Sequence, residues 1–93
     1  MVIGLLTLEL NIPAHSLKGK RHVVKSVKAR MRNEFNVSVA EVDALNSHQT
    51  AVIAAVCVSN DNKYTYGLLN RIANWVEETR LDCLLVDYQI EML

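Results

Sequence analysis

Cysteine, glycine motifs and long apolar runs are scarce in this chain, and each shortage excludes a class of protein. The two cysteines, Cys57 and Cys83, stand far apart and outside any CxxC pattern. This excludes a zinc site or a redox motif built on paired cysteines. We interpret both as reduced, buried, small apolar side chains. The three glycines form no GxxG loop, so a KH domain is excluded as well.

No apolar run approaches the roughly 20 residues that cross a bilayer. The first residues also lack the cationic leader and cleavage site of a signal peptide. We therefore expect a cytoplasmic protein with no membrane partner. Its 93 residues predict a single domain, 1–93, that is long enough to bury a conventional hydrophobic core.

The charges balance in total, since ten Lys and Arg residues match ten Asp and Glu residues, but the two signs are separated along the chain. One acid-free segment holds seven of the cations: Lys18, Lys20, Arg21, Lys25, Lys28, Arg30 and Arg32. Elsewhere the acids are opposed only by Lys63, Arg71 and Arg80. The molecule is therefore predicted to be electrically two-sided.

Hydrophobic periodicity predicts six elements in the order β-α-β-β-α-β. The strands are predicted over residues 2–12, 37–44, 50–58 and 83–90. Pro13 ends the first strand because it cannot donate to a ladder, and a shift of apolar parity near Glu41 indicates a bulge or an edge position in the second. The third strand is apolar on both parities, which favours a central position in the sheet.

The first predicted helix lies within His15–Asn33 and continues to about Phe35. Ser16 is its predicted N-cap, and Asn36 is expected to end it in a left-handed turn. At 100° per residue, one face is predicted to be buried: Leu17, Val24, Val27, Met31 and Phe35. The neighbouring face forms a stripe of cations, Lys18, Arg21, Lys25, Lys28 and Arg32, with Lys20 and Arg30 flanking it.

The second predicted helix begins in the polar turn 59–62, where Asp61 suits the positive end of the helix dipole. One broad face of this helix is expected to be buried: Tyr64, Leu68, Leu69, Ile72, Trp75 and Val76.

This order of elements predicts a ferredoxin-like α/β (α+β) sandwich with two helices on one face of a four-stranded mixed sheet. The expected strand order is 4-1-3-2, with the first and third strands central and parallel. Cys57 and Cys83 would then lie two strand spacings apart, about 9.5 Å, which is too far for a disulfide.

The face of the sheet away from the helices is expected to be open: Ile3, Leu5, Thr7 and Glu9, with Ala51, Ile53, Ala55, Cys57, Leu85 and Asp87. Its middle is too apolar for bare solvent, which predicts a homodimer through this face or through an edge strand. A small exposed patch is the alternative.

Four stretches of the chain resemble the bacterial YlxP-like family of unknown function: residues 15–21, 24–28, 35–42 and 58–61. The likeness covers nearly the whole chain, and it implies a ferredoxin-like fold and no established catalytic residue. The family's genes often sit beside those for translation initiation and ribosome maturation, which implies a role near the ribosome. The chain departs from the family pattern at Gly19, where a glutamate is usual, and at His48, where a tryptophan is common.

The cation stripe predicts binding to the phosphates of structured RNA or of the ribosome. The competing interpretation is a merely solvated helix face. The absence of interleaved acids favours the first, because a helix built only for solubility gains from alternating i, i+4 pairs. Base stacking of the kind used by RRM domains is disfavoured, since the first and third strands carry no aromatic residue.

The sequence contains no recognisable set of catalytic, metal-binding or cofactor-binding residues. We therefore expect a protein that is not an enzyme and uses no cofactor. His15, His22 and His48 lack the i, i+4 spacing of a helical metal site. Ser16 next to His15 is accounted for as a cap and has no oxyanion loop. The loop 12–15 lacks both the arginine of an acylphosphatase and the MxCxxC motif of a copper chaperone.

Two further interpretations stay open. Three acids, Glu9, Glu41 and Asp43, would cluster near the sheet if they faced the same side, although strand acids are more often solubilising edge charges. The alternative function is a homo-oligomeric interaction or small-ligand regulatory domain that uses the open sheet face.

Overall fold

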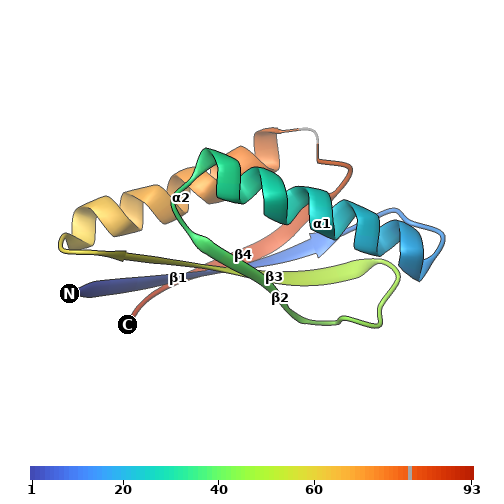
Figure 1. Ribbon diagram of the computed structural model, residues 1–93, viewed down its shortest axis with the longest axis horizontal. Coiled ribbons are helices and arrows are strands. Elements are labelled where there is room, and N and C mark those ends of the chain that lie inside the picture. Colours follow the sequence, from blue (N-terminus) through green and yellow to red (C-terminus); the bar gives the residue numbers. More distant parts are fainter. Residues whose placement is uncertain (80) are drawn as a thin grey trace.

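The computed structural model describes residues 1–79 and 81–93 and contains the six predicted elements in the predicted order (Figure 1). They are β1 (Val2–Asn11), α1 (Leu17–Glu34), β2 (Ser38–Asp43), β3 (Thr50–Ser59), α2 (Asn62–Glu78) and β4 (Leu84–Met92). The strands form one sheet of order β2-β3-β1-β4, and both helices cover the same face of it (Figure 1). This architecture confirms the ferredoxin-like α+β sandwich.

The sheet is antiparallel throughout, so the expectation of a mixed sheet with parallel central strands was wrong. β1 runs antiparallel to both β3 and β4, and β2 runs antiparallel to β3. The reason lies in the path of the chain. A crossover through α1 returns the chain in the direction of β1, and the β2–β3 hairpin then reverses it, so β3 must oppose β1.

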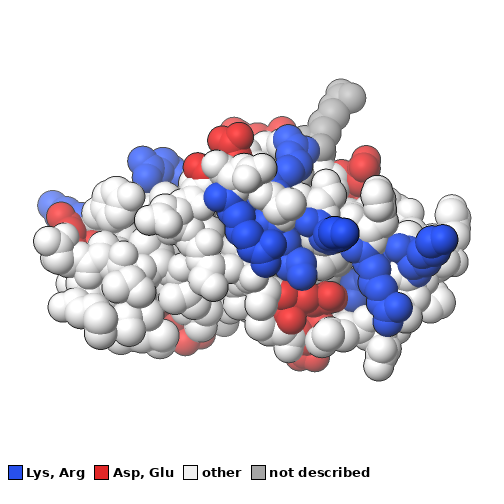
Figure 2. Space-filling view, in the orientation of Figure 1, with Lys and Arg blue, Asp and Glu red and all other residues white. Residues whose placement is uncertain are grey.

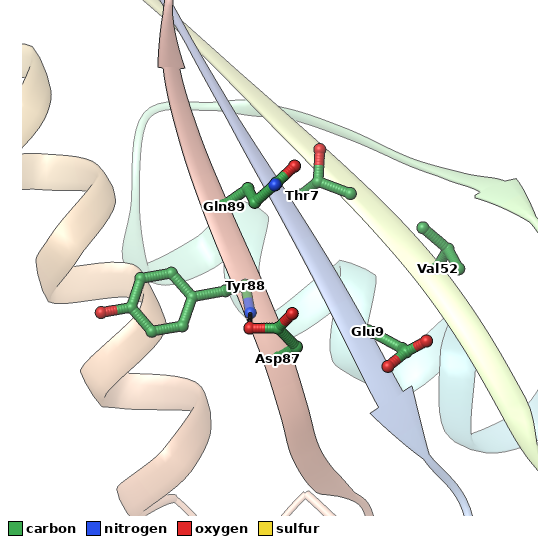
Figure 3. A pocket seen from close by; sticks show the side chains of 6 residues that line it. All are labelled: Thr7, Glu9, Val52, Asp87, Tyr88 and Gln89. Carbon is green, nitrogen blue, oxygen red and sulfur yellow. Dashed lines mark hydrogen bonds between the residues drawn. The ribbon is translucent and has the colours of Figure 1, made fainter.

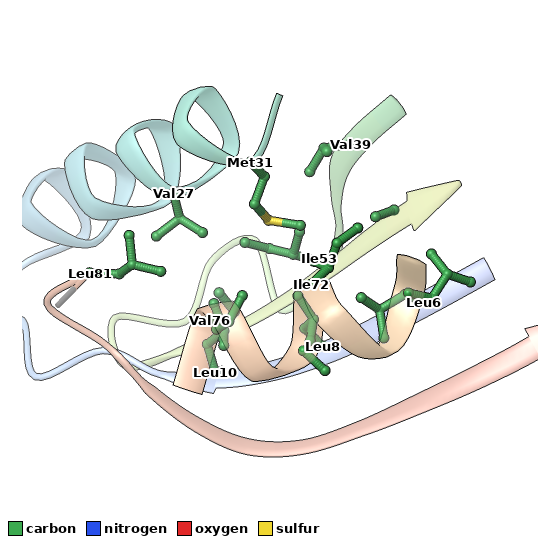
Figure 4. Close-up of a cluster of buried hydrophobic side chains, with 14 of the residues drawn as sticks. Leu6, Leu8, Leu10, Val27, Met31, Val39, Ile53, Ile72, Val76 and Leu81 are labelled. Atoms are coloured by element: carbon green, nitrogen blue, oxygen red, sulfur yellow. The ribbon is translucent and has the colours of Figure 1, made fainter. Parts of the chain in front are cut away.

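The core lies between the helices and the sheet. Helix α1 contributes Val24, Val27 and Met31, as predicted, while Leu17 and Phe35 are partly buried. The side chains contributed by α2 are Leu68, Leu69, Ile72, Ala73 and Val76. They pack against inward-facing strand residues that include Leu6, Leu8, Leu10 and Ile53 (Figure 4).

One predicted core residue of α2 is wrong, because Tyr64 is 53% exposed and Thr65 takes the buried position in the first turn. Trp75 is partly buried and makes an edge-to-face contact with Phe35, with ring centroids 5.5 Å apart. Because Phe35 caps α1 and Trp75 lies on α2, this contact joins the two helices.

The predicted N-cap of α1, Ser16, is confirmed, and among the polar residues 59–62 the N-cap of α2 is Asp61. Ser16 Oγ accepts a hydrogen bond of 3.0 Å from the amide of Gly19, and Asp61 accepts from the amides of Lys63 and Tyr64. The predicted left-handed turn at Asn36 is wrong. Helix α1 ends instead at Phe35 in an extended conformation, φ −135°, with the Phe35 amide bonded to the carbonyl of Met31.

Strand β3 exposes the opposite parity from the one expected. Leu5 pairs with Val56 and Leu6 pairs with Ala55, so the partners of the solvent-facing residues of β1 are Val52, Ala54, Val56 and Val58. The expected set, Ala51, Ile53, Ala55 and Cys57, lies under the helices and is buried. Both parities of this strand are apolar, so only its register with β1 determines which side faces the core.

Two bulges shape the edge strands. The bulge predicted near Glu41 is confirmed by a register shift between Glu41 and Asp43. A second register shift occurs in the β1–β4 pairing between Glu9 and Leu10. It places Leu85 opposite the buried Leu10, so Leu85 packs on the core and the prediction that it faces outward was wrong. Asp87 pairs with Glu9 and lies on the open face as predicted.

Both cysteines are free, as predicted. Cys57 is buried on β3, whereas Cys83 is only partly buried and precedes β4. Strand β1 lies between β3 and β4. None of the helices in the described part of the chain is long and apolar enough to cross a membrane.

Candidate nucleic-acid interface on helix α1

The outward face of α1 carries the predicted cationic stripe, which we define as Lys18, Arg21, Lys25, Lys28 and Arg32. Lys28 is partly buried and the other four are exposed. From the first to the last of these residues the helix rises by about 21 Å. Figure 2 shows Lys and Arg side chains in a band over the region of α1. The structure therefore brings these five predicted residues together on one surface.

Most of the stripe is not neutralised within the molecule. Among residues 1–79 and 81–93, Lys18, Arg21, Lys25 and Lys28 have no carboxylate within salt-bridge distance. Arg80 lies outside the described residues. Four cations spaced along one helix face thus form a positive surface available to an external anion.

Lys20 does not flank the stripe, so its predicted place on the RNA-binding surface was wrong. Its side chain is 0% exposed, and its Nζ lies 2.6 Å from Oε2 of Glu41. The same atom donates to the carbonyl of Ala44 at 2.8 Å. A signal was present in the sequence: Lys20 continues the i, i+4, i+7 spacing of Val24 and Val27, which puts it in the middle of the buried face.

Arg30 also stands apart from the stripe. At 100° per residue it lies about 160° around the helix from the centre of the stripe. Its guanidinium sits 5.8 Å from the ring centroid of Trp75 on α2, within the range of a cation–π contact. Arg30 therefore faces the neighbouring helix instead of extending the cationic stripe.

Two contacts hold α1 over β2 and so orient the stripe. One is the buried pair of Lys20 with Glu41. The other joins Nη2 of Arg32 to the carbonyl of Val39 at 2.9 Å. A guanidinium has five N–H donors, so Arg32, which is exposed, retains donors for a ligand.

The remaining candidates from the sequence do not form a catalytic or metal centre in the described residues. His15, His22 and His48 are all exposed, and no group of three or more His, Cys, Asp or Glu side chains within 1–79 and 81–93 is arranged to hold a metal ion. Burial raises the pKa of the Cys83 thiol, and the neighbouring Asp82 carboxylate raises it further. Cys83 therefore stays protonated and poorly nucleophilic at neutral pH.

The three acids suggested by the sequence do not gather. Glu41 turns to the helix side, where it pairs with Lys20. Glu9 and Asp43 both pair with Val52 and lie on the open side of the sheet. Glu9 and Asp87 were both predicted on the open face, whereas Asp43 was not. Asp87 stands opposite Glu9, and these two acids line a shallow hollow with Thr7, Val52, Tyr88 and Gln89 (Figure 3). Only the strand register brings these residues side by side.

The four antiparallel strands and two one-sided helices define a ferredoxin-like α+β domain. The de novo designed protein Foldit4 shares this fold with a TM-score of 0.52 over 98% of this chain and 96% of its own, at 12% sequence identity. The chain belongs to the DUF503 family of proteins of unknown function, which it matches over residues 3–90. It is also 33% identical over 64 residues to the "Uncharacterized protein YlxP" of Bacillus subtilis (strain 168), covering 69% of this chain and 70% of that protein. These matches confirm the YlxP-like resemblance.

Proposed function

We propose that this protein is a non-enzymatic, cytoplasmic accessory protein that binds structured RNA or the ribosome through the cationic stripe of α1, with a role near translation or ribosome maturation. The observation that supports it best is the set Lys18, Arg21, Lys25 and Lys28. Their side chains share one helix face and have no carboxylate partner among the described residues. Binding of RNA to such a surface is favourable because it releases the counterions that are condensed on the phosphate backbone.

Structured RNA fits this surface better than an unpaired strand. Single-stranded recognition depends on aromatic platforms for the bases, and α1 contains no Phe, Tyr or Trp. Strands β1 and β3, which would carry the stacking residues of an RRM, contain none either. A straight row of charges about 21 Å long matches recognition of a duplex by its shape and phosphates.

The charge distribution supports the same ligand. All four strands lack Lys and Arg, whereas α1 carries seven such residues. The zero net charge of the chain therefore conceals a positive helical layer. The positive helical layer attracts the phosphates of RNA and the acidic sheet repels them, so RNA is expected to approach the helices and avoid the sheet.

A paired-variant binding experiment tests the proposal. The variant Arg21→Ala/Lys25→Ala removes two exposed cations of the stripe, and Lys63→Ala/Arg71→Ala removes two exposed cations of α2, with the same change in net charge. Affinity for a short RNA duplex is measured across a salt series. The stripe variant should reduce the log–log salt slope by about 1.4 to 1.8 for two lost phosphate contacts, and the α2 variant should leave it unchanged. Equal effects, or none, contradict the proposal.

The alternative function, a homo-oligomeric interaction or small-ligand domain, has one observation in its favour. Ile3, Leu5 and Val56 are only partly buried on the face of the sheet that no helix covers. A tight dimer in sedimentation velocity, combined with no RNA affinity at low salt, would favour this alternative over RNA binding.

A further inference from the structure

A second charged surface lies on the opposite side of the molecule from α1. We call it the acid row: Asp43 of β2, Glu9 of β1 and Asp87 of β4. Val52 pairs with both Asp43 and Glu9, and Glu9 pairs with Asp87, so the three carboxylates stand in one line across the open face. With strands about 4.8 Å apart, the row is about 14 Å long.

The acid row is not balanced inside the molecule. Glu9 and Asp87 are directly opposed across β1 and β4, and like charges in that position destabilise a sheet. None of the three acids forms a salt bridge with a described residue, and no strand contains a Lys or Arg. Asp43 and Asp87 accept hydrogen bonds from the backbone amides of Ala44 and Tyr88, at 2.7 and 2.8 Å, which orient their carboxylates and leave the charges in place.

Exposed aliphatic side chains flank both ends of the acid row. Beside Asp43, Val42 is 52% exposed and Leu45 is 54% exposed. On the β4 side, Leu84 is 67% exposed and Val86 is 60% exposed. Leu84 pairs with Asn11, on the same side of β1 as Glu9, and so shares the open face. Val42 and Val86 are the unpaired residues at the two bulges, next to Asp43 and Asp87, so apolar side chains adjoin both ends of the row.

We propose that the acid row and its aliphatic flanks dock an extended cationic segment of a partner protein. Alternate side chains of an extended segment share one face at a spacing of about 6.6 Å, so three Lys or Arg residues span about 13 Å. That length fits the carboxylates, and an apolar residue at each end of the segment then meets the aliphatic flanks. This surface is separate from the cationic stripe, so the inference does not rest on RNA binding.

Charge decides between the possible occupants. A second copy stacked face to face supplies no cation, because the four strands have none, and it would set carboxylates against carboxylates or against apolar side chains. RNA is repelled by the same acids. A cationic polypeptide is the occupant that neutralises Glu9 and Asp87 and also covers apolar surface.

The test uses a synthetic peptide with three lysines at alternate positions, serines between them and a leucine at each end. Backbone amide NMR of the protein follows its binding, and the shifts are expected at Thr7, Val52 and Gln89. The variant Glu9→Gln/Asp43→Asn/Asp87→Asn should weaken binding by about tenfold or more, equivalent to at least about 1.4 kcal/mol. The amide side chains keep an acceptor oxygen for the backbone contacts at positions 43 and 87.

The matched control is Glu34→Gln/Glu77→Gln/Glu78→Gln, which removes three exposed acids from the helices and changes net charge equally. It should leave the peptide affinity unchanged. Replacing the lysines by glutamates should abolish binding, and replacing the leucines by serines should weaken it. Equal losses in both triple variants, or amide shifts confined to the helices, overturn the proposal.

Two measurements on the free protein complete the test. Thermal unfolding of the acid-row variant should occur at the same or a higher temperature than in the parent, because the repulsion between Glu9 and Asp87 is removed. A clearly lower temperature would show that the row stabilises the fold and would overturn the proposal. A dimer in sedimentation whose formation shifts the backbone amides of Thr7 and Gln89 would make the second copy the occupant and would overturn the proposal.

Discussion

The buried pair of Lys20 and Glu41 offers a sharp test of the physical reasoning. The Lys20 side chain is 0% exposed and the Glu41 side chain 13%, so the ammonium has no access to water and depends on Glu41 and on the carbonyl of Ala44. Glu41→Gln keeps the size of the side chain and removes its charge. Breaking a buried pair in this way is expected to cost about 3 kcal/mol, because an uncompensated cation remains in the core.

The reverse substitution should be milder. Lys20→Met leaves the Glu41 carboxylate without its cation, but that carboxylate reaches solvent, so we expect a cost of about 1 to 3 kcal/mol. The double variant Lys20→Met/Glu41→Leu should return to within about 1 kcal/mol of the parent, because an apolar pair of similar volume avoids both desolvation costs. The single losses are therefore strongly non-additive.

Urea unfolding followed by circular dichroism and by Trp75 fluorescence measures these free energies. In a domain of this size each 1 kcal/mol also shifts the melting temperature by about 4 to 8 °C, which gives an independent readout. A loss below about 1 kcal/mol for Glu41→Gln would refute the desolvation argument. A double variant less stable than both single variants would refute the claim that the pair can be replaced by apolar packing.

Two further predictions concern glycine and cysteine. Gly4→Ala should destabilise the fold by about 1 to 3 kcal/mol in urea unfolding, because the added Cβ would overlap Thr65 Cγ2 and lie 2.8 Å from Leu69 Cδ1. Gly67→Ala should instead stabilise the fold by about 0.5 to 1 kcal/mol, because Gly67 lies in α2 with open space around it. The opposite order of stability would contradict the packing. The raised pKa of Cys83 favours its protonated form in the folded state, so any stability from it is present below the unfolded pKa and is lost as pH rises through the folded pKa. Iodoacetamide should accordingly alkylate folded Cys83 more slowly than a cysteine peptide at pH values between those two pKa values, with mass spectrometry locating the adduct, and equal rates would contradict the burial argument.

Local signals were sufficient for the elements and for most of the candidate site. The alternation in β1, the hydroxyl of Ser16 and the carboxylate of Asp61 each act within a few residues, so their outcomes follow from the sequence. The stripe is likewise a consequence of helical spacing alone. The prediction for Lys20 was wrong because its place in the apolar repeat of α1, and not its charge, decides its burial.

Two errors in the sheet, the exposed side of β3 and the side of Leu85, share one physical cause, which is pairing between distant segments. The apolar β3 strand has two equally hydrophobic sides, and only its register with β1 turned Val52 and Val56 outward. A bulge opposite Glu9 turned Leu85 inward. The direction of β3 was settled by the reversal in the β2–β3 hairpin, which hydrophobic periodicity does not encode.

The sequence by itself determined the order of elements, the N-cap of α1 and the positive face of that helix, because these depend on contacts within one or two helical turns or on strand alternation. Only the tertiary structure decided that Lys20 pairs with Glu41 and that Glu9, Asp43 and Asp87 align across the four strands of the sheet. Such neighbours are set by strand register and helix docking, where small shifts in pairing change which side chains meet and cost little in local preference.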